Sequence, residues 1–221
     1  PPPTPPTSPP AGAARWRGVR APGHGEVRER GSRFAGVLLP ASSAAEASAL
    51  AAEIARQRLA ATHHARAHRV LTPTGAIATF THDAGEPAGA AGRPLLDALS
   101  GAEIVNAVLV VSRWFGGMRL GLGNLARAYA AAARAAIEAA ALTPLTLRRR
   151  VEVEAPFDRA GAVAAAAARA GASVEAVRPA GRWRATLLVP DERVAALERA
   201  VADATGGKAR VTAGPAVLVA G

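Results

Sequence analysis

The sequence contains no cysteine, only one methionine and one lysine, and eight aromatic residues among 221. Without cysteine there is no disulfide scaffold, thiolate metal site or thiol nucleophile, and a reducing compartment is favoured. Arginines interrupt the alanine-rich stretches, so no apolar run reaches the roughly 18 residues that a membrane helix needs. The proline-rich start lacks the apolar stretch of a secretory signal. We therefore expect a cytoplasmic protein with no membrane partner.

The formal net charge of +10 is concentrated at the two ends of the chain. Residues 1–33 carry six arginines and two acids, and residues 148–221 carry twelve basic residues and eight acids. The central residues 34–147 are nearly balanced, with nine arginines and seven acids. Such a surplus permits contact with an anionic surface such as ribosomal RNA. A compositional bias towards arginine, alanine and proline explains it equally well.

Composition and periodicity predict an α+β chain with two domains. Residues 1–24 are expected to be a disordered proline-rich tail, because they cannot bury a core. Residues 25–145 form the predicted N-terminal domain. Its expected elements are a strand from about Gly25 to Pro40, a helix from Ser43 to about Ala60, strands at 66–72 and 76–81, a helix at 94–99, a strand at 104–111 and a helix at 124–141. Ser43 and Glu46 have the spacing of a capping box at the first helix.

The remaining residues, 146–221, predict a second fold. Strands and helices are expected in the order strand, helix, strand, strand, helix, strand, at 150–155, 157–170, 173–178, 183–189, 191–204 and 209–219. This βαββαβ order is typical of a ferredoxin-like sandwich.

Two glycine-rich segments flank the apolar strand at 104–111, and we place the function there. The first reads DAGEPAGAAGRPLL from Asp83 to Leu96, and the second reads SRWFGGMRLGLGNLARAY from Ser112 to Tyr129. Glycines at this density suit sharp turns, positive φ angles and close approach of a ligand to the backbone.

The second segment ends at the start of a predicted helix, where free backbone N–H groups favour an anion. Asn124 is a suitable N-cap residue, and arginines flank it. The predicted nucleic-acid or anion site consists of Arg113, Gly116, Gly117, Arg119, Gly121, Gly123, Asn124 and Arg127. Alternatively, the glycines only make tight turns and a close helix–strand contact. Trp114 and Phe115 could stack on a base, but we favour a role in the core.

Histidines and acids near the first segment raise the question of catalysis. Adjacent residues of a strand point to opposite faces, so at most one of His63 and His64 can join a site with Asp83 and Glu86. One alternative is a hydrolase that uses His64, Asp83 and Glu86. The other is that the two acids cap the turn and the following helix and pair with Arg93 or Arg113.

Neither a metal nor an organic cofactor is expected. Residues 121–126 fit the form G-x-G-x-x-A of the dinucleotide fingerprint, which must lie directly between a strand and a helix. Here about nine residues separate Val111 from Gly121, and no acidic strand end follows. A dinucleotide cofactor is therefore not predicted.

The two segments together resemble the YigZ/IMPACT family. They are similar to its patterns D-D-G-E-P-x-G-T-A-G-x-P and R-[YWF]-[FY]-G-G-x-x-L-G-x-G-x-L-x-x-A-Y, and the upstream GSRFAG and ATHHARAH resemble its S-R-F and H-H elements. The resemblance covers about residues 29–142. The motif positions that it assigns are Arg33, His63, His64, Asp83, Gly85, Glu86, Pro87, Gly89, Gly92, Arg113, Gly116, Gly117, Gly121, Gly123 and Tyr129.

The resemblance implies an N-terminal sandwich like that of a small-subunit ribosomal protein and of elongation factor G, with a left-handed β-α-β crossover, an exception to the usual hand. It implies a second domain like the last domain of elongation factor G. It also implies a non-enzymatic, translation-associated regulator that binds RNA or the ribosome, or one that binds only proteins. Three positions depart from the pattern: Ala84 replaces Asp, Ala90 replaces Thr, and Asn124 stands where glycine is common.

Overall fold

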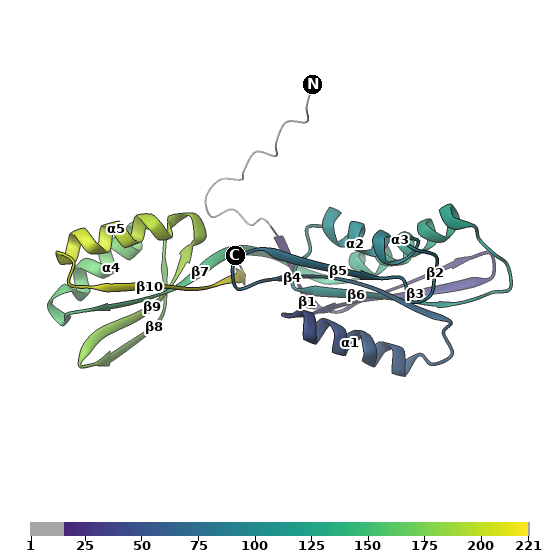
Figure 1. The fold of residues 1–221 in the computed structure, drawn as a ribbon, viewed down its shortest axis with the longest axis horizontal. Coiled ribbons are helices and arrows are strands. Elements are labelled where there is room, and N and C mark those ends of the chain that lie inside the picture. The colour runs from purple at the N-terminus through teal and green to yellow at the C-terminus, as the bar shows by residue number, and fades with distance from the viewer. Residues whose placement is uncertain (1–15, 221) are drawn as a thin grey trace, which may run out of the picture. The chain divides into compact units, whose positions relative to one another are not determined.

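The computed structural model describes residues 16–220. It divides into two compact units, which are described separately. The N-terminal unit comprises Trp16–Thr72 and Ala76–Leu145, and the C-terminal unit comprises Pro73–Gly75 and Thr146–Ala220 (Figure 1). No helix among the described residues is both long enough and apolar enough to cross a membrane.

The chain is regular from residue 16 onwards, so the expected tail at 1–24 extends too far. Residues 1–15 of that tail lie outside the described residues. Strand β1 (Trp16–Ala21) pairs antiparallel with the first residues of β7 (Ala141–Ala155). The alternation of apolar residues in β1 is weak, and its stabilising partner lies more than a hundred residues away. The sequence signal is therefore absent locally.

The N-terminal unit is built on a five-stranded sheet in the order β2-β3-β6-β4-β5. Its strands are β2 (Gly23–Glu29), β3 (Ser32–Pro40), β4 (His63–Leu71), β5 (Ile77–His82) and β6 (Ala107–Trp114). The single strand expected up to Pro40 is a hairpin. Arg30 and Gly31 both adopt positive φ, at 44° and 80°, which closes a two-residue turn of the kind that suits hairpins.

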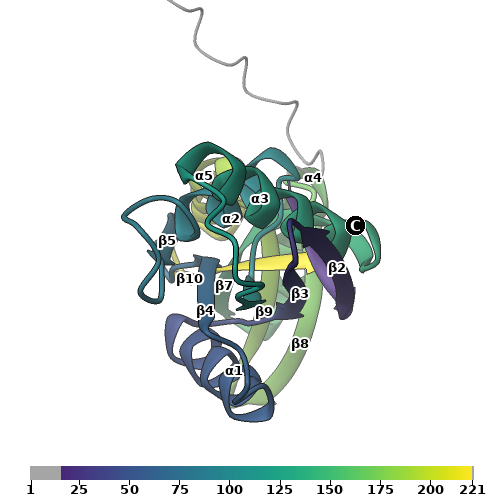
Figure 2. The ribbon, with the colours of Figure 1, turned by 90° about the vertical axis from the view of Figure 1, so that its right-hand side faces the viewer.

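Helices cover both faces of this sheet. Helix α1 (Ala44–Gln57) lies on one face, and α2 (Gly92–Gly101) and α3 (Leu122–Glu138) lie on the other (Figures 1 and 2). Both β3 and β4 run antiparallel to the β6 strand between them, so they are parallel to each other, and α1 makes the β-α-β crossover.

Residue parity decides which face a side chain of β4 or β6 reaches. In β6 the odd-numbered Leu109 and Val111 pack in the core under α2 and α3, whereas Val108 and Val110 pack under α1. In β4 Ala65 and Ala67 likewise face α2 and α3. This alternation places the candidate site residues below.

Helix α3 lies unusually close to β2 and β3 because both strands present glycine to it. A Cβ atom added at Gly36 would lie 2.6 Å from the carbonyl oxygen of Ala132, and one added at Gly25 would lie 2.4 Å from the nitrogen of Ala136. Real Cβ atoms do not tolerate such distances. The contact therefore needs glycine on the strands and favours alanine on the helix.

The C-terminal unit has the predicted ferredoxin-like fold. Its helices are α4 (Ala160–Arg169) and α5 (Val194–Thr205), and its other strands are β8 (Ser173–Ala180), β9 (Arg182–Pro190) and β10 (Arg210–Ala220). The sheet order is β10-β7-β9-β8. Val151, Leu187 and Leu197 lie in its separate core, where each is at most 1% exposed.

Candidate functional site

The two motif segments meet where β6 ends. We call residues 83–91, between β5 and α2, the acidic loop, and residues 115–121, between β6 and α3, the glycine loop. His63 of β4 and Arg113 of β6 are register partners beside both loops. The face of the sheet under α2 and α3 therefore carries the site.

Asp83 caps helix α2. Its Oδ1 accepts hydrogen bonds from the backbone N–H groups of Ala91 at 3.0 Å and Gly92 at 2.8 Å, and its Oδ2 accepts one from Gly89 at 2.9 Å. Burial raises the pKa of Asp83, but these backbone bonds outweigh burial and lower the pKa overall. The motif carboxylate thus occupies the position at which the amino end of α2 would otherwise hold an external anion.

Glu86 is buried in a network with Arg113 and Tyr129. Arg113 Nη1 donates to Glu86 Oε1 at 2.7 Å and to Oε2 at 3.0 Å, and the Tyr129 hydroxyl donates to Oε1 at 2.8 Å. The side chains of Glu86 and Arg113 are only 4% and 7% exposed. Burial and the hydrogen bond to Glu86 raise the pKa of Tyr129, so the phenol stays protonated and remains a donor.

These contacts agree in part with the alternative in which the two acids cap the turn and the following helix and pair with arginine. Asp83 caps α2, and Glu86 pairs with Arg113 rather than Arg93, which pairs with Asp97. Arg113 is consequently withdrawn from the predicted anion site. Its positive charge is neutralised by the buried carboxylate of Glu86.

His63, and not His64, joins the acids. His63 Nδ1 lies 2.8 Å from the carbonyl oxygen of Ala84, and its Nε2 lies 3.9 Å from Glu86 Oε2. His64 points to the α1 face, where its Nδ1 lies 3.0 Å from Ser112 Oγ. Burial, Arg58 and His63 lower the pKa of His64.

The hydrolase that would use His64, Asp83 and Glu86 is therefore wrong. His64 lies on the opposite face of the sheet, and the oxygens of both acids already accept structural hydrogen bonds. Among residues 16–220 no group of three histidine or acidic side chains is placed to hold a metal ion.

The glycine loop depends on a close backbone approach. A Cβ at Gly116 would lie 1.9 Å from the carbonyl carbon of Gly31, and the Gly116 N–H donates to Ser32 Oγ at 3.2 Å. Gly116 therefore serves the structure of the loop. The Ser32 hydroxyl, which also lies 3.4 Å from Arg113 Nη2, was not predicted, although it belongs to the S-R-F element.

The expected core role of Trp114 and Phe115, at the junction of β6 and the glycine loop, is wrong. Phe115 is 48% exposed. Trp114 lies on the α1 face, with the Arg33 guanidinium 4.5 Å from its ring centre. The motif residue Arg33 thus lies away from the acidic loop. It pairs with Glu26 at 2.8 Å.

Helix α3 begins with a left-handed glycine and not with Asn124. Gly121 is the N-cap at φ 72°, and Asn124, in the first turn, donates from its side chain to the carbonyl oxygen of Leu120 at 2.9 Å. No described residue accepts a hydrogen bond from the N–H groups of Leu122, Gly123 or Asn124. The amino end of α3 therefore differs from that of α2, which Asp83 fills.

Two of the three predicted arginines remain at this helix end. Arg119 and Arg127 are exposed, and Arg127 Nη2 donates to Asn124 Oδ1 at 2.6 Å. Gly117, in the same loop, also has a positive φ of 88°. Arg119, Arg127, Gly121 and Gly123 thus lie together, whereas Arg113 and Gly116 have structural roles.

One departure from the family pattern and two motif glycines in the acidic loop adopt positive φ angles. Ala84 has a φ of 54°, and Gly85 and Gly89 have 85° and 74°. Aspartate adopts this left-handed region more readily than alanine does. The aspartate that the family pattern has at position 84 therefore suits the turn geometry.

A cavity of about 360 Å³ opens between the two loops. His63, Glu86 and Arg113 line it from the sheet side and the acidic loop. Its other lining residues are Pro87, Phe115, Arg119, Leu120, Gly121, Leu122 and Leu125. The motif segments thus line one space, in which His63, Glu86 and Arg113 lie beside mainly apolar residues.

Comparisons with known proteins agree with this arrangement. Residues 30–137 match the Impact N-terminal domain. An IMPACT family member of Thermus thermophilus is 37% identical over 178 residues, which cover 80% of this chain and 95% of that protein. The chain belongs to the IMPACT family. At least part of its second unit is included in this alignment, because 178 residues exceed the length of the first.

Other IMPACT family members match over part of their length. YigZ of Escherichia coli is 35% identical over 98 residues, which cover 44% of this chain and 48% of YigZ, and YvyE of Bacillus subtilis is 37% identical over half of each chain. A solved structure described as that of a hypothetical protein has a TM-score of 0.62 at 23% identity, and covers 89% of this chain and 95% of its own. It supports the α+β fold.

Proposed function

We propose that this IMPACT family protein is a non-enzymatic regulator of translation that binds RNA, including RNA of the ribosome, at the amino end of α3. Family membership supports a translation-related role in general. The observation that carries the finer proposal is the contrast between two helices of the same unit. The amides of α2 are occupied by Asp83, whereas those of Leu122, Gly123 and Asn124 have no acceptor among the described residues.

The charges around this helix end suit a phosphate. Arg119 and Arg127 are exposed beside the free amides, and the partial positive charge of the helix end adds to theirs. Neither arginine forms an ion pair in the described part of the chain. An RNA backbone would therefore meet cations that are not already neutralised.

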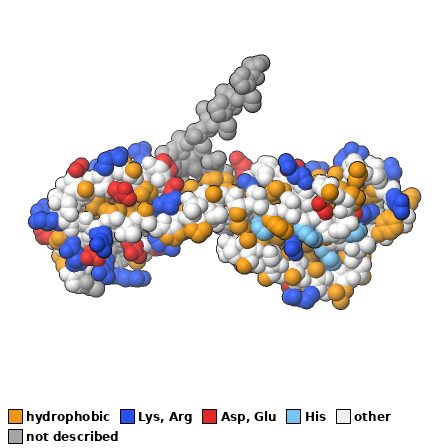
Figure 3. All heavy atoms as spheres, in the orientation of Figure 1, with side chains coloured by type: hydrophobic (Ala, Val, Ile, Leu, Met, Phe, Trp, Pro, Cys, Tyr) orange, Lys and Arg blue, Asp and Glu red, His pale blue; other side chains and the backbone are white. Residues whose placement is uncertain are grey.

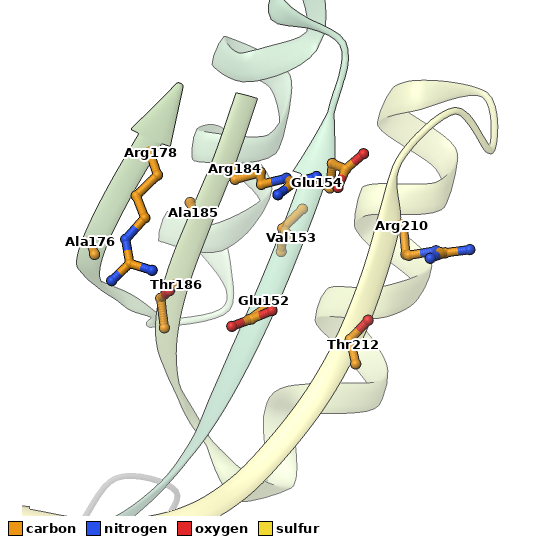
Figure 4. Close-up of a pocket in the computed structure, with 10 residues that line it drawn as sticks. All are labelled: Glu152, Val153, Glu154, Ala176, Arg178, Arg184, Ala185, Thr186, Arg210 and Thr212. Carbon is orange, nitrogen blue, oxygen red and sulfur yellow. Dashed lines mark hydrogen bonds and ion pairs between the residues drawn. The ribbon is translucent and has the colours of Figure 1, made fainter. Parts of the chain in front are cut away.

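The C-terminal sheet offers a second contact surface, considered by itself. A hollow of about 390 Å³ lies on its face away from α4 and α5 (Figure 4). Glu154 in this hollow is neutralised by Arg182 and Arg184. Arg178 on β8, Arg210 on β10 and Glu152 on β7 line the same hollow, so its charges are mixed in sign with an excess of arginine.

Salt-dependent binding of a single-stranded RNA to the full chain tests the proposal. The double variant Arg119→Ala with Arg127→Ala should weaken binding and lower the slope of log affinity against log salt by about one per lost phosphate contact. Arg134→Ala, at an exposed position of the same helix, is the matched control and should keep the native slope. Binding that ignores salt, or that survives the double variant unchanged, would refute the RNA proposal.

A regulator that binds only proteins is the second candidate, and one observation favours it. A groove of about 710 Å³ runs between α2 and α3, lined by apolar residues such as Ala98, Ala130 and Ile137. An apolar groove between helices suits an amphipathic helix of a partner. Nuclease treatment separates the candidates, because a partner that is retained after nuclease does not depend on RNA.

A further inference from the structure

The cavity between the acidic loop and the glycine loop has the size of a small-ligand site. Its volume of about 360 Å³ falls within the range of roughly 300–1,000 Å³ that is usual for such pockets. Phe115 and Leu122, which are 48% and 63% exposed, stand among its lining residues. Large apolar side chains exposed at a cavity suit a flat apolar guest.

The polar side of the cavity presents two hydrogen-bond acceptors. The carbonyl oxygen of Ala84 can only accept, so His63 Nδ1 must donate to it. In the neutral imidazole His63 Nε2 then carries a lone pair. It faces Glu86 Oε2 at 3.9 Å. Glu86 Oε1 accepts from both Arg113 and Tyr129, whereas Oε2 accepts only the longer bond from Arg113.

Two acceptors this close favour a guest that donates. A single nitrogen can lie within hydrogen-bond distance of His63 Nε2 and Glu86 Oε2 at once, because each bond needs about 2.7–3.2 Å. An exocyclic amino group of a base offers two N–H donors. A carbonyl oxygen at the same position would meet two lone pairs instead.

The same cavity adjoins the anion site at α3. Gly121 and Leu122 belong to both, and Arg119 lines the cavity. A guest with a flat base and an attached phosphate would therefore place the base against Phe115 and Leu122 and the phosphate at the helix end. A nucleotide of single-stranded RNA combines these groups, and unstacked bases are the usual targets of RNA recognition.

We propose that this cavity accepts one unstacked RNA base that carries an exocyclic amino group, as cytosine, adenine and guanine do, and that this group donates to His63 Nε2 and Glu86 Oε2. The proposal rests on the proposed RNA-binding function. It adds a preference among bases that phosphate contacts alone cannot give.

Cytosine and uracil provide the sharpest test, since an amino group replaces a carbonyl oxygen at one position. Oligocytidine and oligouridine of equal length are titrated into the full chain at one salt concentration. Oligocytidine should bind about tenfold more tightly, the lower part of the range for a specific base contact. His63→Ala should abolish the preference and leave the salt dependence. Leu122→Ala should weaken both ligands, and Leu59→Ala, at a position 84% exposed elsewhere on the unit, should weaken neither.

The outcomes separate this inference from the function on which it rests. Equal, salt-dependent affinity for the two oligonucleotides would overturn the base pocket and leave the RNA-binding proposal standing. Tighter binding of oligouridine, or a preference that survives His63→Ala, would also overturn it. Absence of binding to either would overturn both proposals. If His63→Ala does not fold, the comparison of bases in the native chain and Leu122→Ala still decide the matter.

Discussion

At the scale of single residues, Glu86 connects three elements of the N-terminal unit. The carboxylate lies in the acidic loop and holds Arg113 of β6 and Tyr129 of α3. Arg113 also lies 5.4 Å from the ring centres of both Phe34 and Phe115. Removal of the carboxylate would leave a buried guanidinium without its counter-charge, which is the costly way to break an ion pair.

Glu86→Ala should therefore destabilise the N-terminal unit strongly. We expect a loss of about 3–5 kcal/mol in its free energy of unfolding, measured by urea unfolding followed by NMR signals of that unit. Glu138→Ala, at an exposed position of α3, is the control and should change stability by less than about 0.5 kcal/mol. Similar small effects for both variants would contradict the network.

Asp83 makes the stability of the N-terminal unit depend on acid. Its pKa is lowered in the folded chain, so its contribution is fully present above the unfolded pKa of about 3.9 and disappears as the pH falls through the folded value. Asp83→Asn should be less stable at neutral pH and should lose less stability on acidification below about pH 5. Asp97→Asn, at the exposed pair with Arg93, should keep the native slope. Parallel pH curves for the native chain and Asp83→Asn would contradict this role.

Residue roles could be predicted from the sequence only where local geometry decides them. Spacing and charge were enough for the capping by Asp83 and for a pairing of Glu86 with arginine. The choice between His63 and His64 needed the register of β4 against β6, which is a tertiary property. The buried network likewise joins Glu86 to Tyr129 on a helix 43 residues later.

At the scale of elements, the close packing of α3 on β2 and β3 is the most demanding contact. Backbone atoms of the helix occupy the space that side chains at Gly25 and Gly36 of the strands would need. The sequence predicted the helix, whose buried residues include Leu125, Tyr129 and Ala133. It could not predict which strands the helix covers.

Gly36→Ala tests that contact. The added methyl group would overlap the carbonyl of Ala132, and we expect a loss of about 1–3 kcal/mol or more in the stability of the N-terminal unit. Gly101→Ala, at the end of α2 with no heavy atom within 4 Å of the added carbon, should be neutral or slightly stabilising, because alanine suits a helix better than glycine does. Equal stability changes, measured by thermal unfolding, would refute the close approach.

Most strands and helices were predicted within a few residues, and the larger misses are the β2–β3 hairpin, strand β1 and the part of β7 before residue 150. The β2–β3 hairpin turns at Arg30-Gly31 without the Asn-Gly or Asp-Gly signal that marks such turns. Strand β1 gains its pairing from Ala141–Leu145, far along the chain. The hairpin therefore lacks its usual turn signal, whereas β1 depends on a partner that is distant in the sequence.

At the scale of the whole molecule, each unit has a hydrophobic core of its own. Basic and acidic side chains are interleaved on the visible face of the C-terminal unit (Figure 3), and several of its arginines form ion pairs. The net charge of +10 therefore says less about a binding surface than the local pairing of each arginine does.

Leu187→Ala should unfold the C-terminal unit selectively. Leu187 is 1% exposed in that core, and truncation of a buried leucine costs about 2–5 kcal/mol. Urea unfolding followed by NMR should show an earlier transition for this unit and an unchanged one for the N-terminal unit. Leu188→Ala, at a half-buried neighbour on the same strand, should shift it less. A joint shift of both transitions would show that the units unfold as one.

The adjacent histidines of β4 have a consequence for insertions and deletions. His63 serves the cavity and His64 contacts Ser112 on the other face, so the two imidazoles would trade places if one amino acid were gained or lost within the strand. Length changes of a single residue are compatible with this architecture only in the connections outside β4, such as 58–62. In engineering this segment it is therefore more important to keep each position on its face of the sheet than to keep the amino acid that occupies it.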